Sequence, residues 1–335
     1  MILAVLVILA HSPELVDGNR SREILTRIFG TLSLGDVGVD GFFLLSGFLI
    51  TKSFQRSPTL FGYVTKRVAR IYPGFVVAFL MSLLVVAPLA GVAPLSFAAV
   101  AAQVPGMAML QEPLATGAFA GLPHPQLDGS LWTIGYEFRC YGLVLVAGLL
   151  GVLRRKFLCL TLVATMVGLS LAQLDFGTHV LWQVTGNLNV MLRFGMLFGC
   201  GALFHLFDGQ VRYTRGGAIA AAMILCAALF SPRCAEPGLA IAGGYVLFYL
   251  AFHCNGTRYN RIGDRADLSY GTYLYAWPIQ NLLIYWFHGI SPWALDLIAL
   301  PASLLLATAS WYGVERPFMR LSHSRPKVSW VLARG

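Results

Sequence analysis

GFVVAFLMSLLVVAPLAGVA, residues 74–93, contains no charged side chain and a single polar one, a serine. A helix must run for roughly 20 predominantly apolar residues to cross the hydrocarbon core of a bilayer. This stretch is long enough, and similar apolar stretches recur along the chain. The sequence therefore predicts an all-α membrane protein that crosses the bilayer several times.

The composition fits the same class of protein. Hydrophobic residues make up 57% of the 335 residues and charged residues 12%, whereas a soluble domain carries roughly 25% charged residues. The mean hydropathy is +0.70. Too few charged residues remain to coat a water-facing surface. We expect residues 1–335 to form one membrane-embedded domain without a soluble appendage.

About ten transmembrane helices are expected in this polytopic bundle. Their approximate ranges are 1–13, 37–53, 74–93, 130–152, 157–174, 188–207, 216–231, 238–253, 268–288 and 292–313. The apolar stretch 95–111 contains Pro105, and a further span there would separate the basic cluster at 52–70 from all later basic loops. We expect 95–111 to be re-entrant or to lie at the outer surface.

The net charge of +9 lies mostly in short loops between apolar stretches. This pattern indicates positive loops retained in the cytoplasm rather than a nucleic-acid partner, and it places both termini in the cytoplasm. The six cysteines lack metal or redox spacing, so we expect no disulfide, no metal and no permanently bound cofactor. Only ten apolar residues precede His11, so the first helix is expected to be truncated at its N-terminal end.

Titratable residues inside membrane spans are costly and are therefore candidates for function. His11 ends the first apolar run, and a neutral imidazole can accept a proton from a hydroxyl. The alternative is an interfacial histidine bonded to a carbonyl. Asp36 and Asp40 share one helix face, where Asp40 would orient His11, bind a sugar hydroxyl, or simply lie near water. Ser46 serves either helix packing or substrate binding.

A cationic patch precedes the third span. Lys66, Arg67 and Arg70 share one helix face and are followed by Tyr72. Arginine binds phosphate in bidentate fashion, so we interpret these four residues as a candidate site for the phosphates of a nucleotide-bearing substrate. The alternative is anchoring to anionic membrane lipids.

The densest polar cluster is SLWTIGYEFRCY at 130–141. Glu137 and Arg139 point in different directions on a regular helix, so one is expected to face a cavity while the other pairs with a neighbouring helix. Trp132 and Tyr136 are candidates to stack on a sugar ring or to lie at the membrane interface. Near the C-terminus, Glu315 and Arg316 are expected to form a local ion pair.

Six segments together resemble the acyltransferase-3 family of bacterial membrane acyltransferases. They occur in family order, span nearly the whole chain, and comprise His11, VDGFFLLSGFLI at 39–50, KRVARIYP at 66–73, SLWTIGYEFRCY at 130–141, LSYGTYLYAWPI at 268–279 and VERPF at 314–318. Two family features are missing. An arginine expected upstream of His11 would precede Met1, and Ala276-Trp277 stands where the family often carries a histidine.

The resemblance implies a bacterial cytoplasmic (inner) membrane protein that uses an acyl-coenzyme A, acetyl-coenzyme A above all, as co-substrate approached from the cytoplasm. It also implies a glycan or lipid-linked saccharide of the cell envelope as acceptor, and a catalytic role for His11. The resulting hypothesis is O-acyl transfer, with His11 as base, Glu137 or Asp40 orienting it, and Trp132, Tyr136, Ser46 and Arg139 binding substrate.

Two alternatives use the same polar groups without this chemistry. A transporter or flippase for a lipid-linked glycan would pass its substrate between the buried polar residues, although the internal repeats frequent in transporters are not evident here. A catalytically impaired family member would keep the fold alone.

Overall fold

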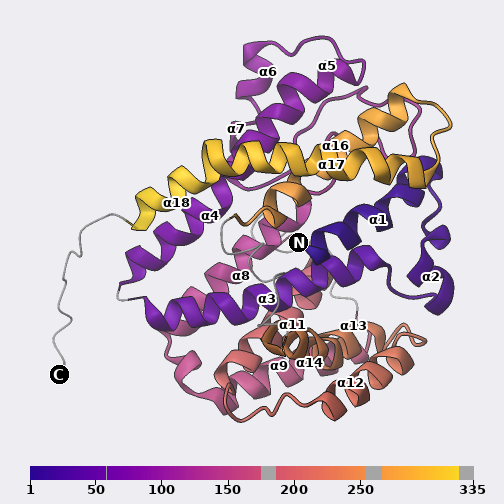
Figure 1. Cartoon of the computed structure of the whole chain (residues 1–335). Helices are drawn as coiled ribbons and strands as arrows, with labels where there is room; N and C mark the ends of the chain where they lie inside the picture. The colour runs from indigo at the N-terminus through magenta and orange to yellow at the C-terminus, as the bar shows by residue number, and fades with distance from the viewer. Residues whose placement is uncertain (58, 175–185, 254–265, 324–335) are drawn as a thin grey trace.

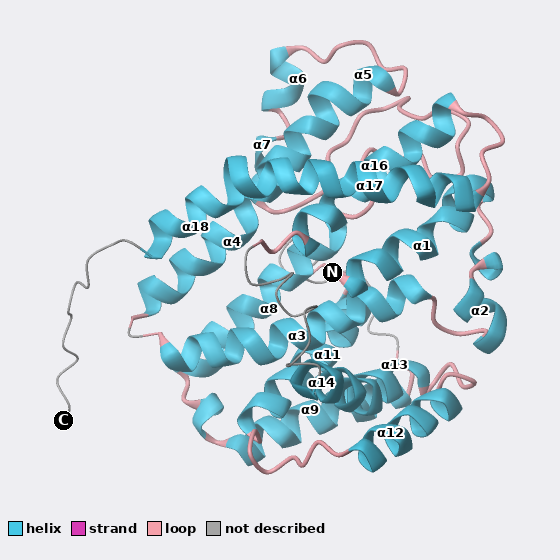
Figure 2. Cartoon of the chain, viewed as in Figure 1, coloured by secondary structure: helices cyan, strands magenta, loops and turns pink. Residues whose placement is uncertain are grey.

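The computed structural model describes residues 1–57, 59–174, 186–253 and 266–323. These residues form helices joined by loops, without a strand (Figure 2). The described helices are α1 (Ile2–Asp17), η1 (Arg20–Arg22), α2 (Ile24–Phe29), α3 (Leu34–Arg56), α4 (Leu60–Met81), η2 (Ser82–Val86), α5 (Ala87–Leu89), α6 (Phe97–Ala101), α7 (Val104–Ala108), α8 (Trp132–Leu149), η3 (Val152–Arg154), α9 (Lys156–Leu171), α11 (Leu188–Leu206), α12 (Arg215–Ala228), α13 (Ala235–Gly238), η4 (Leu239–Gly243), α14 (Gly244–His253), α16 (Ser269–Trp286), α17 (Pro292–Ser310), η6 (Trp311–Glu315) and α18 (Arg316–His323).

Five of the described helices are long and apolar enough to cross a membrane: Leu34–Arg56, Leu60–Leu89, Leu188–Leu206, Ala235–His253 and Pro292–Leu321. Three of them continue through a π-helical turn, at η2, η4 and η6. The other five predicted spans coincide with α1, α8, α9, α12 and α16, which have 14 to 18 residues. The membrane-protein class is thus supported, whereas the predicted count of about ten spans is not confirmed.

The ambiguous stretch 95–111 forms two five-residue helices, α6 and α7, and not a membrane-spanning helix. They lie at one edge of the molecule (Figure 1). The hydroxyl of Tyr72 donates to the carbonyl of Ala108 at 2.7 Å and ties this segment to α4.

Helix α3 is the central element, with α1 and α11 packed on it. At Gly47 a Cβ would lie 1.9 Å from the carbonyl oxygen of Phe198, and at Gly201 it would lie 2.0 Å from that of Leu44. Small residues allow such close approach of membrane helices. The tight crossing places polar residues of α3 against α11.

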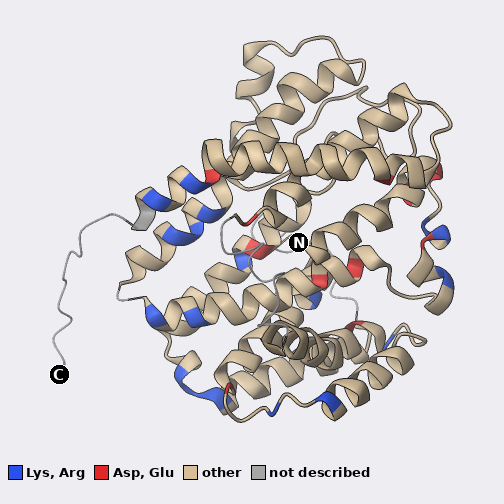
Figure 3. Ribbon diagram, in the orientation of Figure 1, with Lys and Arg blue, Asp and Glu red and all other residues tan. Residues whose placement is uncertain are grey.

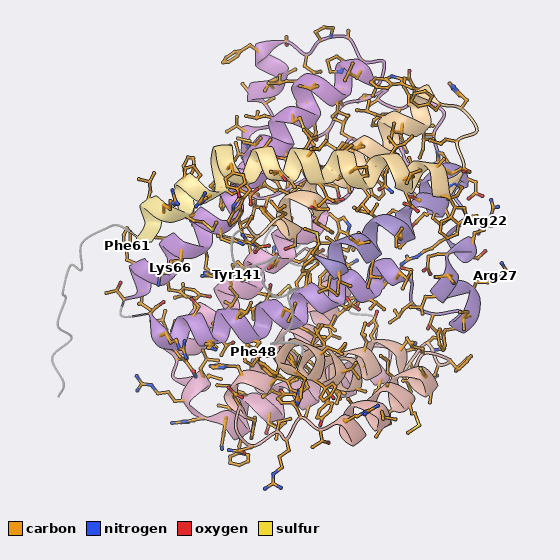
Figure 4. All side chains as sticks on the ribbon, in the orientation of Figure 1. Arg22, Arg27, Phe48, Phe61, Lys66 and Tyr141 are labelled. Atoms are coloured by element: carbon orange, nitrogen blue, oxygen red, sulfur yellow. The ribbon has the colours of Figure 1, made fainter. Side chains whose placement is uncertain are left out.

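Basic residues are concentrated at one end of the bundle. Figure 3 shows most lysines and arginines at the left and lower edges, where α3 ends and α4 begins. The opposite end holds few, among them Arg22 and Arg27 (Figure 4). We refer to the first end as the basic end. The two ends of the bundle therefore differ in their content of basic residues, as expected from the distribution of lysine and arginine among the predicted loops.

Candidate active site

The last turns of α1 present His11 to a partly open position inside the bundle. Its side chain is 26% exposed, and its Nδ1 lies 3.6 Å from Oε2 of Glu14, three residues later on the same helix face. The ring of Trp277 from α16 meets the His11 ring edge-on at 4.9 Å between centroids. The imidazole therefore lies between a carboxylate on one side and an indole on another.

A second histidine completes this group. His124, in the long loop between α7 and α8, lies with its Nε2 3.9 Å from Oε1 of Glu14 and its ring 6.1 Å from that of Trp277. The buried side-chain amide of Asn281 donates to the backbone carbonyls of His124 and Gln126. Helix α16 thus fixes the loop that carries His124 beside the last turns of α1. We call His11, Glu14, His124 and Trp277 the histidine cluster.

A buried polar network anchors α1 behind His11. The hydroxyl of Ser12 donates to Oδ1 of Asp296 on α17 at 2.5 Å. The amide of Gln280 on α16 donates to Ser12 Oγ at 2.8 Å and to the carbonyl of Ile8 at 3.1 Å. Because these bonds join three helices, they determine how α1 is rotated and therefore where His11 points.

Glu137 belongs to a different cluster. Its Oε1 accepts hydrogen bonds of 2.6 Å from Ser46 on α3 and from Tyr141 one turn further along α8. The guanidinium of Arg67 lies 5.8 Å from the Tyr141 ring centroid, and its buried Nε has no hydrogen-bond partner among the described residues. These residues are far apart in the sequence, but the structure brings them together: Ser46 and Tyr141 both bond to Glu137, and Arg67 lies over Tyr141. We call them the Glu137 cluster.

Arg70 points to a third position. Its guanidinium lies 2.5 Å from the carboxylate of Asp267, just before α16, and 5.5 Å from the ring centroid of Tyr270. Burial alone would raise the pKa of Asp267, but the charge of Arg70 and hydrogen bonds from Ser269 outweigh it, so this pKa lies below its usual value. Lys66 is half-buried on α4, towards the basic end (Figure 4).

Asp40 is fully buried and engaged elsewhere. Both of its carboxylate oxygens lie about 3 Å from Arg193 on α11, at 3.0 and 2.9 Å. Arg193 also contacts Asp36 at 3.1 Å and Glu236 at 3.4 Å. The predicted shared face of the two aspartates is confirmed, but this face binds an arginine and not His11. A buried charge must be paired, which explains the arrangement.

Neither carboxylate proposed to orient His11 does so. Within the described residues, the carboxylate nearest the ring belongs to Glu14, while Asp40 contacts Arg193 and Glu137 contacts Ser46 and Tyr141. The spacing of His11 and Glu14 was visible in the sequence. The contact of His124 with Glu14 could not be seen in the sequence. His124 is 113 positions after His11, in a loop without periodicity.

The aromatic residues of α8 are partly packed inside. Trp132 is 41% exposed and lies edge-on to Tyr136, whose hydroxyl accepts a hydrogen bond from the backbone of Asn187. The Arg139 guanidinium lies 4.9 Å from the Tyr136 ring centroid. The expected ion pair between Glu315 and Arg316 is wrong. Glu315 accepts from Ser310, and Arg316 lies over Tyr312.

The histidine cluster, the Glu137 cluster and the Arg70–Asp267 pair occupy three different positions in the bundle. Helix α1 begins near the centre of the molecule, at the point marked N, and runs towards the end that carries α2 (Figure 1). His11 is ten residues after Met1, which is roughly 15 Å along a helix. The histidine cluster therefore lies towards the end opposite the basic end.

The order and geometry of these groups can be compared with known proteins. A family model described as an acyltransferase domain matches residues 1–312. The chain belongs to the acyltransferase-3 family. It is therefore a membrane protein that transfers acyl groups other than amino-acyl groups, and the resemblance seen in the sequence is confirmed.

Two relatives extend this family assignment. An O-acetyl transferase of Shigella phage Sf6 is 27% identical over 348 residues, covering 98% of this chain and 96% of the phage protein. Nodulation protein 10 of Rhizobium leguminosarum bv. viciae is 29% identical over 320 residues, covering 86% of this chain and 83% of that protein. No solved structure matches the chain. The relatives support O-acyl transfer as the reaction class.

Proposed function

We propose that this acyltransferase moves an acetyl group from acetyl-coenzyme A to a hydroxyl of a cell-envelope or exported glycan, in the bacterial cytoplasmic membrane. The observation that carries the proposal is the partly exposed imidazole of His11, held between Glu14 and Trp277 inside the bundle. The name of the phage relative supports the acetyl group. The donor and the glycan acceptor are inferred from the family resemblance.

His11 is the proposed general base. With Nδ1 turned towards Glu14, Nε2 is the nitrogen that accepts the proton of the acceptor hydroxyl as its oxygen attacks the thioester carbonyl. The tetrahedral intermediate then collapses, the C–S bond breaks, and His11 returns the proton to the leaving thiolate. The products are the O-acetylated acceptor and free coenzyme A thiol, so no proton is gained or lost.

Arg67 and Arg70 are the proposed contacts for the phosphates of the donor, together with Lys66. The Nε of Arg67 has no hydrogen-bond partner among the described residues and is free to donate to a phosphate oxygen. Arg70 pairs with the Asp267 carboxylate, and a phosphate would take the place of that carboxylate. The pantetheine chain of the donor would then follow α1 towards His11. Tyr72 bonds to Ala108 and is a wall residue of this region rather than a phosphate ligand in our proposal.

The acceptor is proposed to reach His11 from the end opposite the basic end. His124 and the exposed edge of Trp132 lie on that route, and both residue types bind sugar hydroxyls or stack on sugar rings. Ser46, Tyr136, Glu137 and Arg139 lie deeper in the bundle. We assign Ser46 and Glu137 to alignment of the donor thioester between the two ends.

The test is acetyl transfer by the full chain in membranes given acetyl-coenzyme A with labelled acetyl. We expect His11→Ala to reduce label in the envelope glycan fraction by about 10²–10⁴-fold, the usual contribution of a general base. The control is His288→Ala, because His288 is exposed in the loop before α17. Undiminished transfer by a normally produced His11→Ala variant would contradict the proposal.

A further inference from the structure

A groove of about 350 Å³ lies between α9, α11 and η4, outside the three positions described above. Its lining residues are uncharged and almost wholly apolar. They include Leu160, Ala164 and Val167 from α9, Leu203 from α11, Phe207 directly after α11, and Ile241 from η4. Ala164 and Ile241 are exposed, so the groove opens on the outer face of the bundle. In a membrane protein this face meets hydrocarbon, and the groove fits an aliphatic chain.

Lys156 lies at one mouth of this groove. It begins α9 and is four residues before Leu160 and eight before Ala164, so it shares the helix face that lines the groove. Its Nζ lies 5.1 Å from the ring centroid of Phe207, a lining residue. Within the described parts of the chain, no carboxylate pairs with Lys156. A lysine that borders an apolar groove without a carboxylate offers a site for an anion.

More positive charge flanks the groove residues along the chain. Arg154 and Arg155 precede Lys156, and Arg212 and Arg215 follow the lining residue Val211, all four exposed. Asp208 is the one acidic residue in these two segments. The lower-left edge of the molecule in Figure 3 is correspondingly blue. Basic residues in these loops are expected if the loops are retained in the cytoplasm. That rule does not explain why Lys156 also borders an apolar groove.

We propose that this groove is a binding site for an anionic membrane phospholipid, with an acyl chain against α9 and α11 and the phosphate at Lys156 and the neighbouring arginines. Apolar contact holds the chain, and the positive mouth selects the negative headgroup. None of the lining residues belongs to the histidine cluster or to the Arg67 and Arg70 positions. The ligand is therefore a resident lipid and not a reactant, and the site is independent of the proposed acetyl transfer.

Native mass spectrometry of the purified, delipidated full chain tests this site with phosphatidylglycerol and phosphatidylcholine as probes. Ala164→Trp fills the groove, and Leu162→Trp is the matched control, because Leu162 is 48% exposed on the same helix and does not line the groove. We expect the wild type and Leu162→Trp to retain phosphatidylglycerol, and Ala164→Trp to lose it. Lys156→Gln should weaken phosphatidylglycerol binding about five-fold and leave phosphatidylcholine unchanged.

Three results would overturn the proposal. One is equal retention of phosphatidylglycerol by Ala164→Trp and the wild type. Another is a wild type that does not prefer phosphatidylglycerol to phosphatidylcholine. The third comes from mass spectrometry of the protein before delipidation: a polyprenyl phosphate, instead of a phospholipid, that is present in the wild type and absent from Ala164→Trp. If Ala164→Trp fails to fold, as judged by its elution from a sizing column, Lys156→Gln decides, because Lys156 is only half-buried and glutamine adds no bulk to the groove.

Discussion

Glu14 is the carboxylate beside His11, with Oε2 at 3.6 Å from Nδ1. A general base must present one nitrogen to the proton it abstracts, and in the proposed mechanism this contact leaves Nε2 for that task. His124 approaches the other oxygen of the same carboxylate. We therefore propose Glu14 as a positioning residue shared by two imidazoles, and its replacement should affect catalysis differently from replacement of a substrate-binding group.

We expect Glu14→Gln to lower kcat for acetyl transfer by about tenfold to a hundredfold, less than loss of the whole base. The KM for acetyl-coenzyme A should not change, because the proposed contacts for the donor phosphates, Arg67 and Arg70, lie on α4 and not beside Glu14. Steady-state kinetics of the variant in membranes measures both constants. A rise in KM with unchanged kcat would instead make Glu14 part of the donor site. Glu14→Asp keeps the charge and should recover part of kcat.

Asp267 offers a pH-dependent test of the ion pair with Arg70. Its pKa is below the usual value because Arg70 and Ser269 outweigh burial. Its contribution to folding free energy is therefore present above the unfolded-state pKa, about 3.9, and is lost as the pH falls through the lower folded-state pKa. Asp267→Asn should lower the unfolding temperature at pH 7, and by less at pH 3, where part of this contribution is already lost.

The expected loss for Asp267→Asn at pH 7 is about 1 kcal/mol or less, because the Asp267 side chain is 43% exposed and water screens the pair. Thermal unfolding in detergent at both pH values measures it. Asp208→Asn is the control, since Asp208 is exposed and has no ion pair within the described residues. An equal loss at pH 3 and pH 7 would show that Asp267 acts through packing.

At the scale of helices, the crossing of α3 and α11 holds the polar residues in place. This crossing depends on Gly47 and Gly201, each of which faces the backbone of the other helix. The same pair of helices carries Asp36, Asp40 and Arg193, whose ion pairs require the close approach. Helix packing and charge pairing therefore stabilise the same interface.

Gly47→Ala should destabilise the protein by about 1–3 kcal/mol or more. Its Cβ would lie 1.9 Å from the Phe198 carbonyl oxygen, and this backbone atom can move away only if the two helices separate. Gly142→Ala, on α8, meets no atom within 4 Å and should be neutral. Detergent thermal stability of the two variants gives the comparison. Equal stability of both would mean that α3 and α11 do not cross as closely as the structure has them.

The helices were largely predictable and their contacts were not. Long apolar runs with breaks at charged loops mark each helix, and the ranges 37–53 and 188–207 nearly coincide with α3 and α11. Contacts across the bundle join residues far apart in the chain. Arg70 and Asp267 are separated by 197 positions, and no local pattern relates them. Periodicity places a residue on a helix face, whereas tertiary packing decides which helix that face meets.

At the scale of the whole molecule, the proposed chemistry draws on helices far apart in the chain. Arg67 and Arg70 lie on α4, His11 on α1, and Trp277 on α16, so the proposed site needs the whole bundle. Helix α16 contributes to two of the positions, with the Tyr270 ring beside Arg70 and the Trp277 ring beside His11. A donor that enters at one end and an acceptor that enters at the other would meet at His11.

This separation of entrances depends on the orientation of the molecule in the membrane, which the basic end predicts. Positively charged loops are retained in the cytoplasm, so residues near α9 should face the cytoplasm and those near α2 the outside. In a variant whose six cysteines are replaced, we expect Arg27→Cys to react with a membrane-impermeant maleimide in intact cells. Arg155→Cys should react only after the membrane is opened. Labelling of both positions from one side would place donor and acceptor entrances together and contradict the two-ended route to His11.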